Sequence, residues 1–131
     1  MTRSPRYDRR GNEGGRDDGD KMGSEDFEGW VLNRLSELGE IAVRPMFGGH
    51  GLYWRGVIFG MVFRDRLYFK VDDRTKGDYV SRGMPPFRPN QRQTLTSYFE
   101  VPPEVLEDRE ALLSWARGAI RAGISSQDPA G

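Results

Sequence analysis

The chain has 131 residues, and its 20 Lys or Arg are balanced by 20 Asp or Glu, so the formal net charge at pH 7 is zero. This length corresponds to one domain, and a neutral total argues against a strongly basic nucleic-acid-binding protein. The absence of cysteine excludes disulfides, thiolate metal sites and a cysteine nucleophile. No apolar run approaches the roughly 20 residues of a membrane helix, and no signal-peptide pattern opens the chain. We therefore expect a cytoplasmic protein without membrane contact.

Composition divides the chain into three parts. Residues 1–22 are rich in Arg, Asp and Gly, and we expect a disordered polar tail because such a segment buries too little apolar area to offset the entropy of ordering. A nucleic-acid-binding arm is the alternative for this segment, but the acidic residues among its arginines weaken it. Residues 23–122 hold the periodic patterns of a folded domain, and residues 123–131 form a second, short flexible tail.

The folded part begins with an amphipathic helix followed by a β meander. Ser24 is a suitable N-cap and Gly39 a suitable stop for the helix, whose apolar residues Phe27, Val31 and Leu35 share one stripe. Strands are predicted near residues 51–54, 57–63 and 66–71. The two-residue connections between them have the length of antiparallel hairpin turns.

The second half of the domain alternates helix, loop, strand and helix. Asp72 or Asp73 can cap a helix of about ten residues that ends at Gly83, and the prolines at residues 85–89 predict a loop. A strand near residues 95–101 and a final helix capped by Asp108 follow. The predicted class is α+β: an antiparallel β meander with helices at the start, middle and end, packed mainly on one face.

A series of short motifs accompanies these elements. Met46-Phe47-Gly48-Gly49 leads into a Leu-Tyr strand, and the third strand of the meander contains Leu67-Tyr68-Phe69-Lys70. Pro86-Phe87, residues 97–102 and Trp115-Ala116 follow in order. From about residue 27 to 120 this order and spacing resembles the N-terminal domain of the TfoX/Sxy competence-regulator family. The resemblance implies the same α+β arrangement.

Both faces of the central hairpin are apolar. With a two-residue turn at residues 64–65, strand alternation places Phe59, Met61 and Phe63 on one face, beside Tyr68. Helices on one side of the sheet would leave this face exposed, and monomers seldom tolerate such a patch. Two interpretations stay open: a helix or the proline loop of the same chain covers the face, or Phe59, Met61 and Phe63 form a homodimer or docking face.

Charge is unevenly distributed although the total is zero. The region from residue 44 to 92 holds ten basic residues against four acidic ones, and the flanking helical regions carry the opposite excess. If the helices pack on one side, the other side presents a positive surface able to bind phosphate or an acidic protein patch. Alternatively, the arginines solvate strand edges. The candidate partner-binding residues are Arg66, Tyr68, Lys70, Arg82, Arg88 and Arg92.

Residue sets typical of catalysis or cofactor binding are scarce. His50 is the only histidine and stands between glycines in a turn, which favours a structural or exposed role. A lone His without Cys gives no transition-metal spacing, and the glycines around it lack the Lys-Ser/Thr pair of a phosphate loop. We therefore expect no catalytic residues, no metal and no cofactor.

The resemblance implies a non-enzymatic regulatory domain, because full-length family members act with the cyclic-AMP receptor protein at promoters of DNA-uptake genes. We expect a protein partner, with a transcription factor of that type as the first candidate, while direct DNA binding stays open. Full-length regulators carry a second, C-terminal domain, and this chain ends soon after its last predicted helix, so we expect a standalone version. The alternative is a dimeric secretion-chaperone-like module that holds a peptide or protein on its open sheet, and a small enzyme is third.

Overall fold

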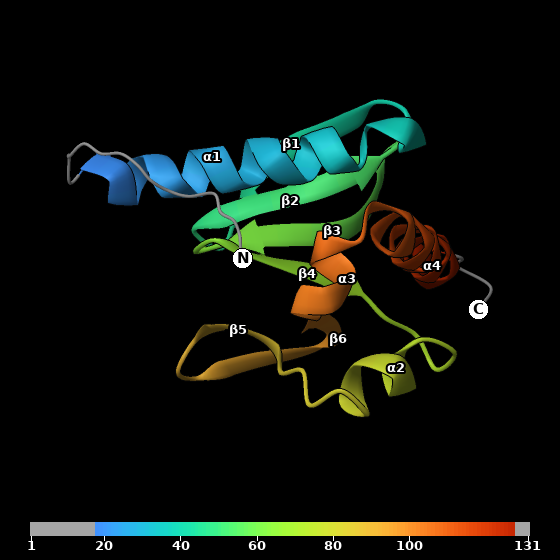
Figure 1. Cartoon of the computed structure of the whole chain (residues 1–131). Helices are drawn as coiled ribbons and strands as arrows, with labels where there is room; N and C mark the ends of the chain where they lie inside the picture. The colour runs from blue at the N-terminus through green and yellow to red at the C-terminus, as the bar shows by residue number, and fades with distance from the viewer. Residues whose placement is uncertain (1–17, 128–131) are drawn as a thin grey trace.

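A six-stranded antiparallel sheet with the order β1-β2-β3-β4-β6-β5 forms the centre of the protein. The computed structural model describes residues 18–127, with side chains described from residue 26. The expected α+β class is confirmed (Figure 1). The elements of the described part are α1 (Asp18–Arg34), the 3-10 helix η1 (Ser36–Leu38), β1 (Ile41–Met46), β2 (Gly49–Trp54), β3 (Val57–Phe63), β4 (Arg66–Lys70), α2 (Lys76–Val80), β5 (Pro86–Asn90), β6 (Gln93–Glu100), α3 (Pro103–Glu107) and α4 (Arg109–Gln127).

Three two-residue turns connect the first four strands into a meander. The central residues are Phe47-Gly48, Arg55-Gly56 and Arg64-Asp65, and all six have positive φ angles. Positive φ at both positions is what a type I′ turn requires, and its twist matches that of the flanking strands. The two connections predicted from the sequence are confirmed, and the first turn adds an edge strand, β1, which pairs with β2 along its whole length.

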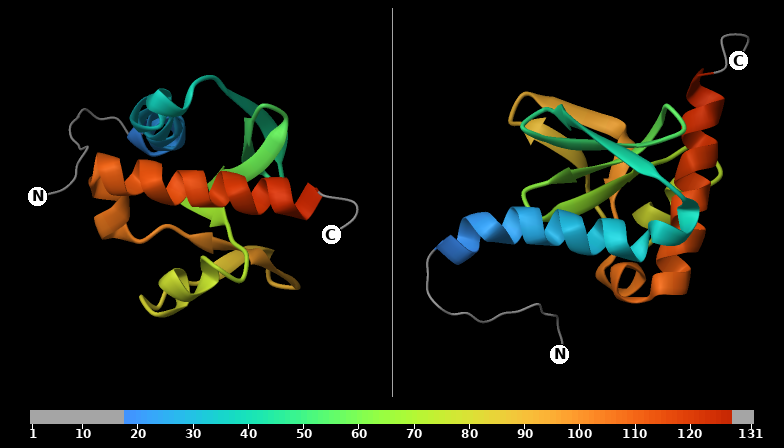
Figure 2. Two further views of the ribbon diagram at one scale, coloured as in Figure 1. Left: turned by 90° about the vertical axis from the view of Figure 1, so that its right-hand side faces the viewer. Right: turned by 90° about the horizontal axis from the view of Figure 1, so that it is seen from above.

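Helices α1 and α4 cover the same face of the sheet. They run in different directions across it (Figure 2) and bury Phe27 and Val31 from α1 with Leu112 and Ala116 from α4 in one core with the sheet. Gly123 permits the close approach, because a Cβ there would lie 2.5 Å from the carbonyl oxygen of Ile58.

The two covering helices are longer than predicted. Helix α1 begins at Asp18, so Ser24 lies inside the helix and residues 18–22 of the predicted tail are helical. Helix α4 continues to Gln127, beyond the predicted stop at residue 123. The rest of the two predicted tails, residues 1–17 and 128–131, lies outside the described residues.

A β-bulge turns Phe59 toward the helices. On β2, Leu52 faces Gly60 while the next residue, Tyr53, faces Ile58, so Phe59 is the extra residue on β3. A bulge redirects the side chain it carries, and Phe59 is fully buried in the core shared with α1 and α4. Its predicted place beside Met61 and Phe63 is therefore wrong, because that prediction assumed unbroken alternation.

The opposite face of the sheet is closed by the chain itself. Phe87 of β5 is fully buried, and its ring centroid lies 5.1 Å from that of Phe63 and 4.9 Å from that of Tyr68. These rings form a second core with Met61 and Tyr98. Of the two interpretations of this face, cover by the proline segment holds. The side chains of Phe59, Met61 and Phe63 therefore provide no exposed dimer face.

The covering segment is an edge strand, not the predicted loop. β5 pairs irregularly with β6, with register shifts on both sides of Phe87. Pro86 and Pro89 are compatible with a strand at this position because an edge strand has one row of backbone groups outside the ladder. The same prolines hinder pairing with another chain.

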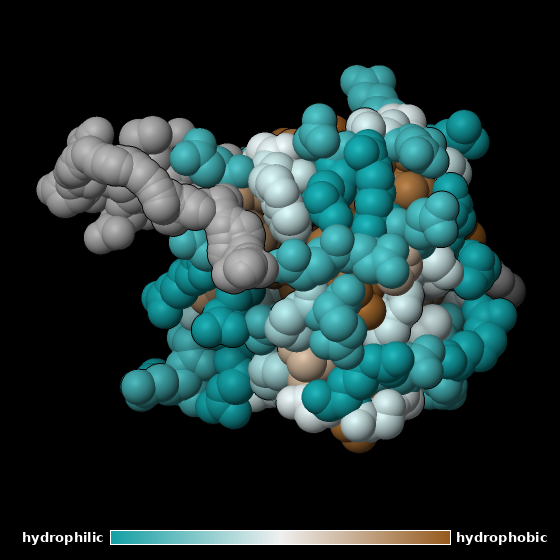
Figure 3. All heavy atoms as spheres, in the orientation of Figure 1, coloured by the Kyte–Doolittle hydropathy of each residue, from teal (hydrophilic) through white to brown (hydrophobic). Residues whose placement is uncertain are grey.

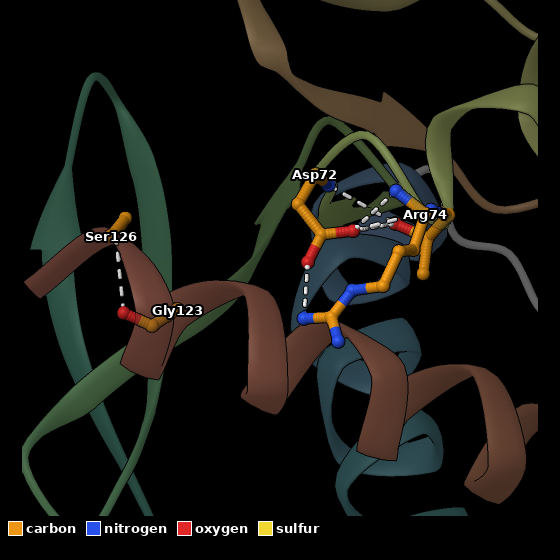
Figure 4. A network of polar contacts seen from close by, with 5 residues as sticks. Asp72, Arg74, Gly123 and Ser126 are labelled. Carbon is orange, nitrogen blue, oxygen red and sulfur yellow. Dashed lines mark hydrogen bonds and ion pairs between the residues drawn. The ribbon is translucent and has the colours of Figure 1, made fainter. Parts of the chain in front are cut away.

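Helix α2 follows a capped turn. The Asp72 side chain accepts hydrogen bonds from the backbone N–H groups of Arg74 and Thr75, and it forms a 3.2 Å ion pair with the Arg74 guanidinium (Figure 4). The prediction that Asp72 or Asp73 caps this helix is wrong, because the N-cap of α2 is Thr75, which has no side-chain cap hydrogen bond, and the helix has only five residues. Asp72 instead stabilises the turn that precedes the helix. Asp108 caps α4 as predicted, accepting from the N–H of Ala111.

Hydrophobic side chains appear singly on the surface seen in Figure 3, among predominantly hydrophilic residues. In the described part of the chain the large exposed apolar residues are Phe47, Val80 and Ile124, which lie on three different elements or turns. None of the described helices is long and apolar enough to cross a membrane.

Candidate functional site

The outer face of the sheet, opposite α1 and α4, places residues of five strands in rows. Strand register sets Arg44 beside Gly51, Gly51 beside Met61, Met61 beside Tyr68, and Tyr68 beside Glu100. Partners in register point to the same face, so these five residues form one row from β1 to β6. In the next row, Tyr53 follows Gly51 on β2, and Lys70 pairs with Tyr98.

Three of the predicted partner-binding residues share the outer face of β4. Arg66 forms a 2.9 Å ion pair with Glu100. Tyr68 is only 7% exposed, and burial, followed by the nearby Glu100 carboxylate, raises the pKa of Tyr68. The Lys70 ammonium lies 5.1 Å from the centre of the Tyr98 ring. Among the described residues no carboxylate pairs with Lys70.

The other three predicted residues lie elsewhere. Arg82 follows α2 and forms a 3.3 Å ion pair with Glu104, with its guanidinium over the Trp115 ring of α4. Arg88 and Arg92 belong to the β5–β6 hairpin, where both are exposed. The six residues therefore do not form one surface, because Arg82 contacts Trp115 of α4, which packs on the opposite face of the sheet.

Arg44 and Tyr53 extend the site beyond the predicted residues. The Arg44 guanidinium lies 5.2 Å from the centre of the Tyr53 ring. Gly51 permits this arrangement: a Cβ there would lie 3.1 Å from the Tyr53 ring. Register carried across the Phe47-Gly48 turn would have identified Arg44, but the prediction began the meander only at residue 51.

Burial changes the chemistry of two groups in this region. Burial lowers the pKa of Lys70, because a partly desolvated ammonium without a carboxylate partner is less stable in its charged form. Burial, and then the neighbouring Tyr53, raises the pKa of Tyr98. The two tyrosines therefore lie close enough to influence each other. Hydrogen-bond donors are therefore present on the side chains of two cations and two phenols: Arg44, Lys70, Tyr53 and Tyr98.

The one histidine has a contact between two elements. His50 Nδ1 lies 2.6 Å from Glu28 Oε1 and so joins β2 to α1. Within the described residues there is no group of three or more His, Cys, Asp or Glu side chains able to hold a metal ion.

Comparison with known proteins identifies the family. The model of the TfoX N-terminal domain family matches residues 33–123, a span from the end of α1 into α4 that includes the whole sheet. No curated protein matches the chain. The matched span covers well over half of the sequence, and it contains every residue of the outer face described above. The chain belongs to the TfoX N-terminal domain family.

Proposed function

We propose that this protein is a non-enzymatic regulatory domain that acts through protein–protein contacts in the cytoplasm. Its proposed partner is a transcription factor of the cyclic-AMP receptor protein type, and its proposed role is coactivation of DNA-uptake genes. The family match supports this proposal. Protein binding is supported by one observation on the outer face: Lys70 and Arg44 lack acidic partners among the described residues.

Binding of a protein fits this surface better than unaided binding of DNA. The domain has zero net charge, so its long-range attraction to a duplex is small. Proteins that bind DNA alone usually place many cations along one face. On the outer face one arginine, Arg66, is already neutralised by Glu100. A partner already bound to DNA would supply the promoter contacts that this domain lacks.

The secretion-chaperone-like alternative depended on an open apolar sheet. Phe87 covers that sheet, and the two edge strands, β1 and β5, contain prolines. The described sheet therefore offers an extended peptide no bare apolar face, and the edge prolines hinder the addition of a strand. No observation in the described part of the chain favours this alternative.

A gel-shift titration on a promoter duplex tests the proposal. The duplex carries a site for the transcription factor, and three mixtures are compared at a stated salt concentration: factor alone, domain alone, and both together. We expect a further shift only when both proteins are present. Tight, sequence-dependent binding by the domain alone would contradict the protein-binding role. Lack of any effect on the factor–DNA complex would contradict the proposed partner.

A further inference from the structure

We propose that Arg44, Tyr53, Lys70 and Tyr98, together the donor surface, bind an acidic segment of the partner protein. The inference rests on the proposed protein-binding function and adds the chemistry of what is bound. The four residues come from β1, β2, β4 and β6 of one sheet. Each cation lies against one of the two tyrosine rings: Arg44 over Tyr53 and Lys70 over Tyr98.

Donor groups of this surface have no acceptor in the described part of the chain. No hydrogen bond there involves the hydroxyl groups of Tyr53 or Tyr98, and neither cation forms an ion pair. Tyr98 is 7% exposed, and a buried polar group normally has a partner. Glu100, a carboxylate on the same face, already accepts from Arg66. A complementary ligand therefore supplies acceptors and negative charge.

Lys70 gives the strongest indication of a ligand. Its side chain is partly buried, and the charged form is disfavoured there by desolvation. A lysine in such a place is stabilised when a carboxylate approaches, because the ion pair offsets the desolvation that the free domain already bears. The bound anion would thus meet an ammonium that has already lost part of its hydration shell. Cations held over aromatic rings are also restricted in conformation, which lowers the entropy cost of binding.

A polypeptide suits the donor surface better than a nucleic acid. Single-stranded nucleic acids bind by stacking bases on free aromatic faces along a basic groove. Here Arg44 and Lys70 lie over the Tyr53 and Tyr98 rings, and little of Tyr98 is accessible. Two unpaired cations also neutralise few phosphates, so binding to nucleic acid would be weak and only slightly dependent on salt. Carboxylate side chains need only the donors that are present.

A chemical-shift titration of the ¹⁵N-labelled full chain tests the inference. The probe is a short oligo-glutamate peptide, with an oligo-glutamine peptide of the same length as the neutral control and an oligothymidylate as the nucleic-acid probe. We expect oligo-glutamate to shift amide signals of β1, β2, β4 and β6 near the four residues and to leave α4 unchanged. The Lys70→Met variant should bind about tenfold more weakly, since a charge-assisted hydrogen bond is lost.

Two further variants separate binding from folding and from general charge. Tyr98→Phe removes only the hydroxyl group and should weaken oligo-glutamate binding by a few fold. Arg121→Gln removes one exposed positive charge from α4 and should bind as the wild type does. Thermal unfolding of each variant verifies the fold, and Lys70→Met should be no less stable than the wild type.

The outcomes distinguish this inference from the proposed function. Shifts scattered over both faces, or equal binding by Lys70→Met and the wild type, would overturn the inference. Tighter binding of oligothymidylate than of oligo-glutamate at the same residues would show that the surface binds nucleic acid and not an acidic polypeptide. If oligo-glutamate does not bind but the promoter complex is still shifted, the proposed function stands and the inference fails. If oligo-glutamate binds the donor surface but the transcription factor does not, the inference stands and the proposed partner is wrong.

Discussion

Phe87 joins the β5–β6 hairpin to the rest of the sheet, and its truncation to alanine is the most informative test of the fold. The side chain is fully buried and contacts the rings of Phe63, Tyr68 and Phe47, the last at a centroid distance of 6.0 Å. None of the described helices contributes a residue to this second core. Phe87 is therefore the one residue of edge strand β5 that belongs to the second core.

The expected cost follows from complete burial. Phe→Ala replacements in cores typically cost about 3–5 kcal/mol, and the lower end applies where the surroundings can collapse into the cavity. Phe87 lies on an irregular edge strand, which relaxes more easily than a central one, so we expect about 3 kcal/mol. For a domain of this size that corresponds to a fall in the thermal midpoint on the order of 10–20 °C.

Urea unfolding followed by tryptophan fluorescence measures the effect. Trp30, Trp54 and Trp115 all pack against the core beneath the helices, so they report on the opposite side of the sheet from Phe87. A large loss seen by these probes shows that the two cores unfold together. Val80→Ala, at a side chain that is 55% exposed, is the control and should change stability by less than about 0.5 kcal/mol. A loss below about 1 kcal/mol for Phe87→Ala would refute the idea that the second core is integral to the fold.

Four further predictions concern backbone spacing and titration. Gly49→Ala places a Cβ in steric overlap with the carbonyl oxygen of Val62 in β3 and should lower the free energy of unfolding by about 1–3 kcal/mol. Gly77→Ala, where nothing lies within 4 Å, should raise it by about 0.4–1 kcal/mol; urea unfolding compares the two. Burial lowers the folded-state pKa of Lys70 below its ordinary 10.5, so the unfolded chain binds more protons and stability rises with pH in that window. Lys70→Met should therefore be more stable than the wild type at neutral pH, by a margin that shrinks as the pH approaches 10.5. Burial raises the pKa of Tyr79, so the unfolded chain loses its proton first and stability falls as the pH rises above 10. Tyr79→Phe should reduce that fall in pH-dependent urea unfolding.

Local rules were sufficient to predict much of the meander. Short connections of two residues set the register of antiparallel strands, and the predicted turn at residues 64–65 is confirmed, with Met61 and Phe63 on the same face as Tyr68. Strand β3 has the predicted bounds. The helix stripe with Phe27 and Val31 also faces the core as expected, because apolar residues at helical spacing must be buried together.

Features that depend on contacts between distant segments were not predictable. The bulge at Phe59 is seen in the pairing of β3 with β2. Gly60, a glycine inside the strand, is a local signal compatible with a bulge, but it does not show which residue becomes the extra one. β5 forms a strand only because β6 offers a ladder to its irregular edge, whereas its prolines taken alone predict a loop. The donor surface was missed in part for the same reason: Arg44 meets Tyr53 only after the first hairpin closes.

The two halves of the outer face differ in whether their side chains have partners within the described part of the chain. Near the Phe47-Gly48 turn, Phe87 completes a buried, mainly aromatic core. Around Lys70, polar donors remain without acceptors in the described part of the chain. Stability alone favours an apolar residue or an ion pair in that second half, because a desolvated lysine without a partner destabilises the folded state. A residue that lowers stability where a simple substitution would raise it is characteristic of a binding site. If Lys70 is a binding residue, Lys70→Met must gain stability and lose affinity for the acidic ligand together. A gain in stability without a loss of binding would mean that Lys70 is only a tolerated surface charge.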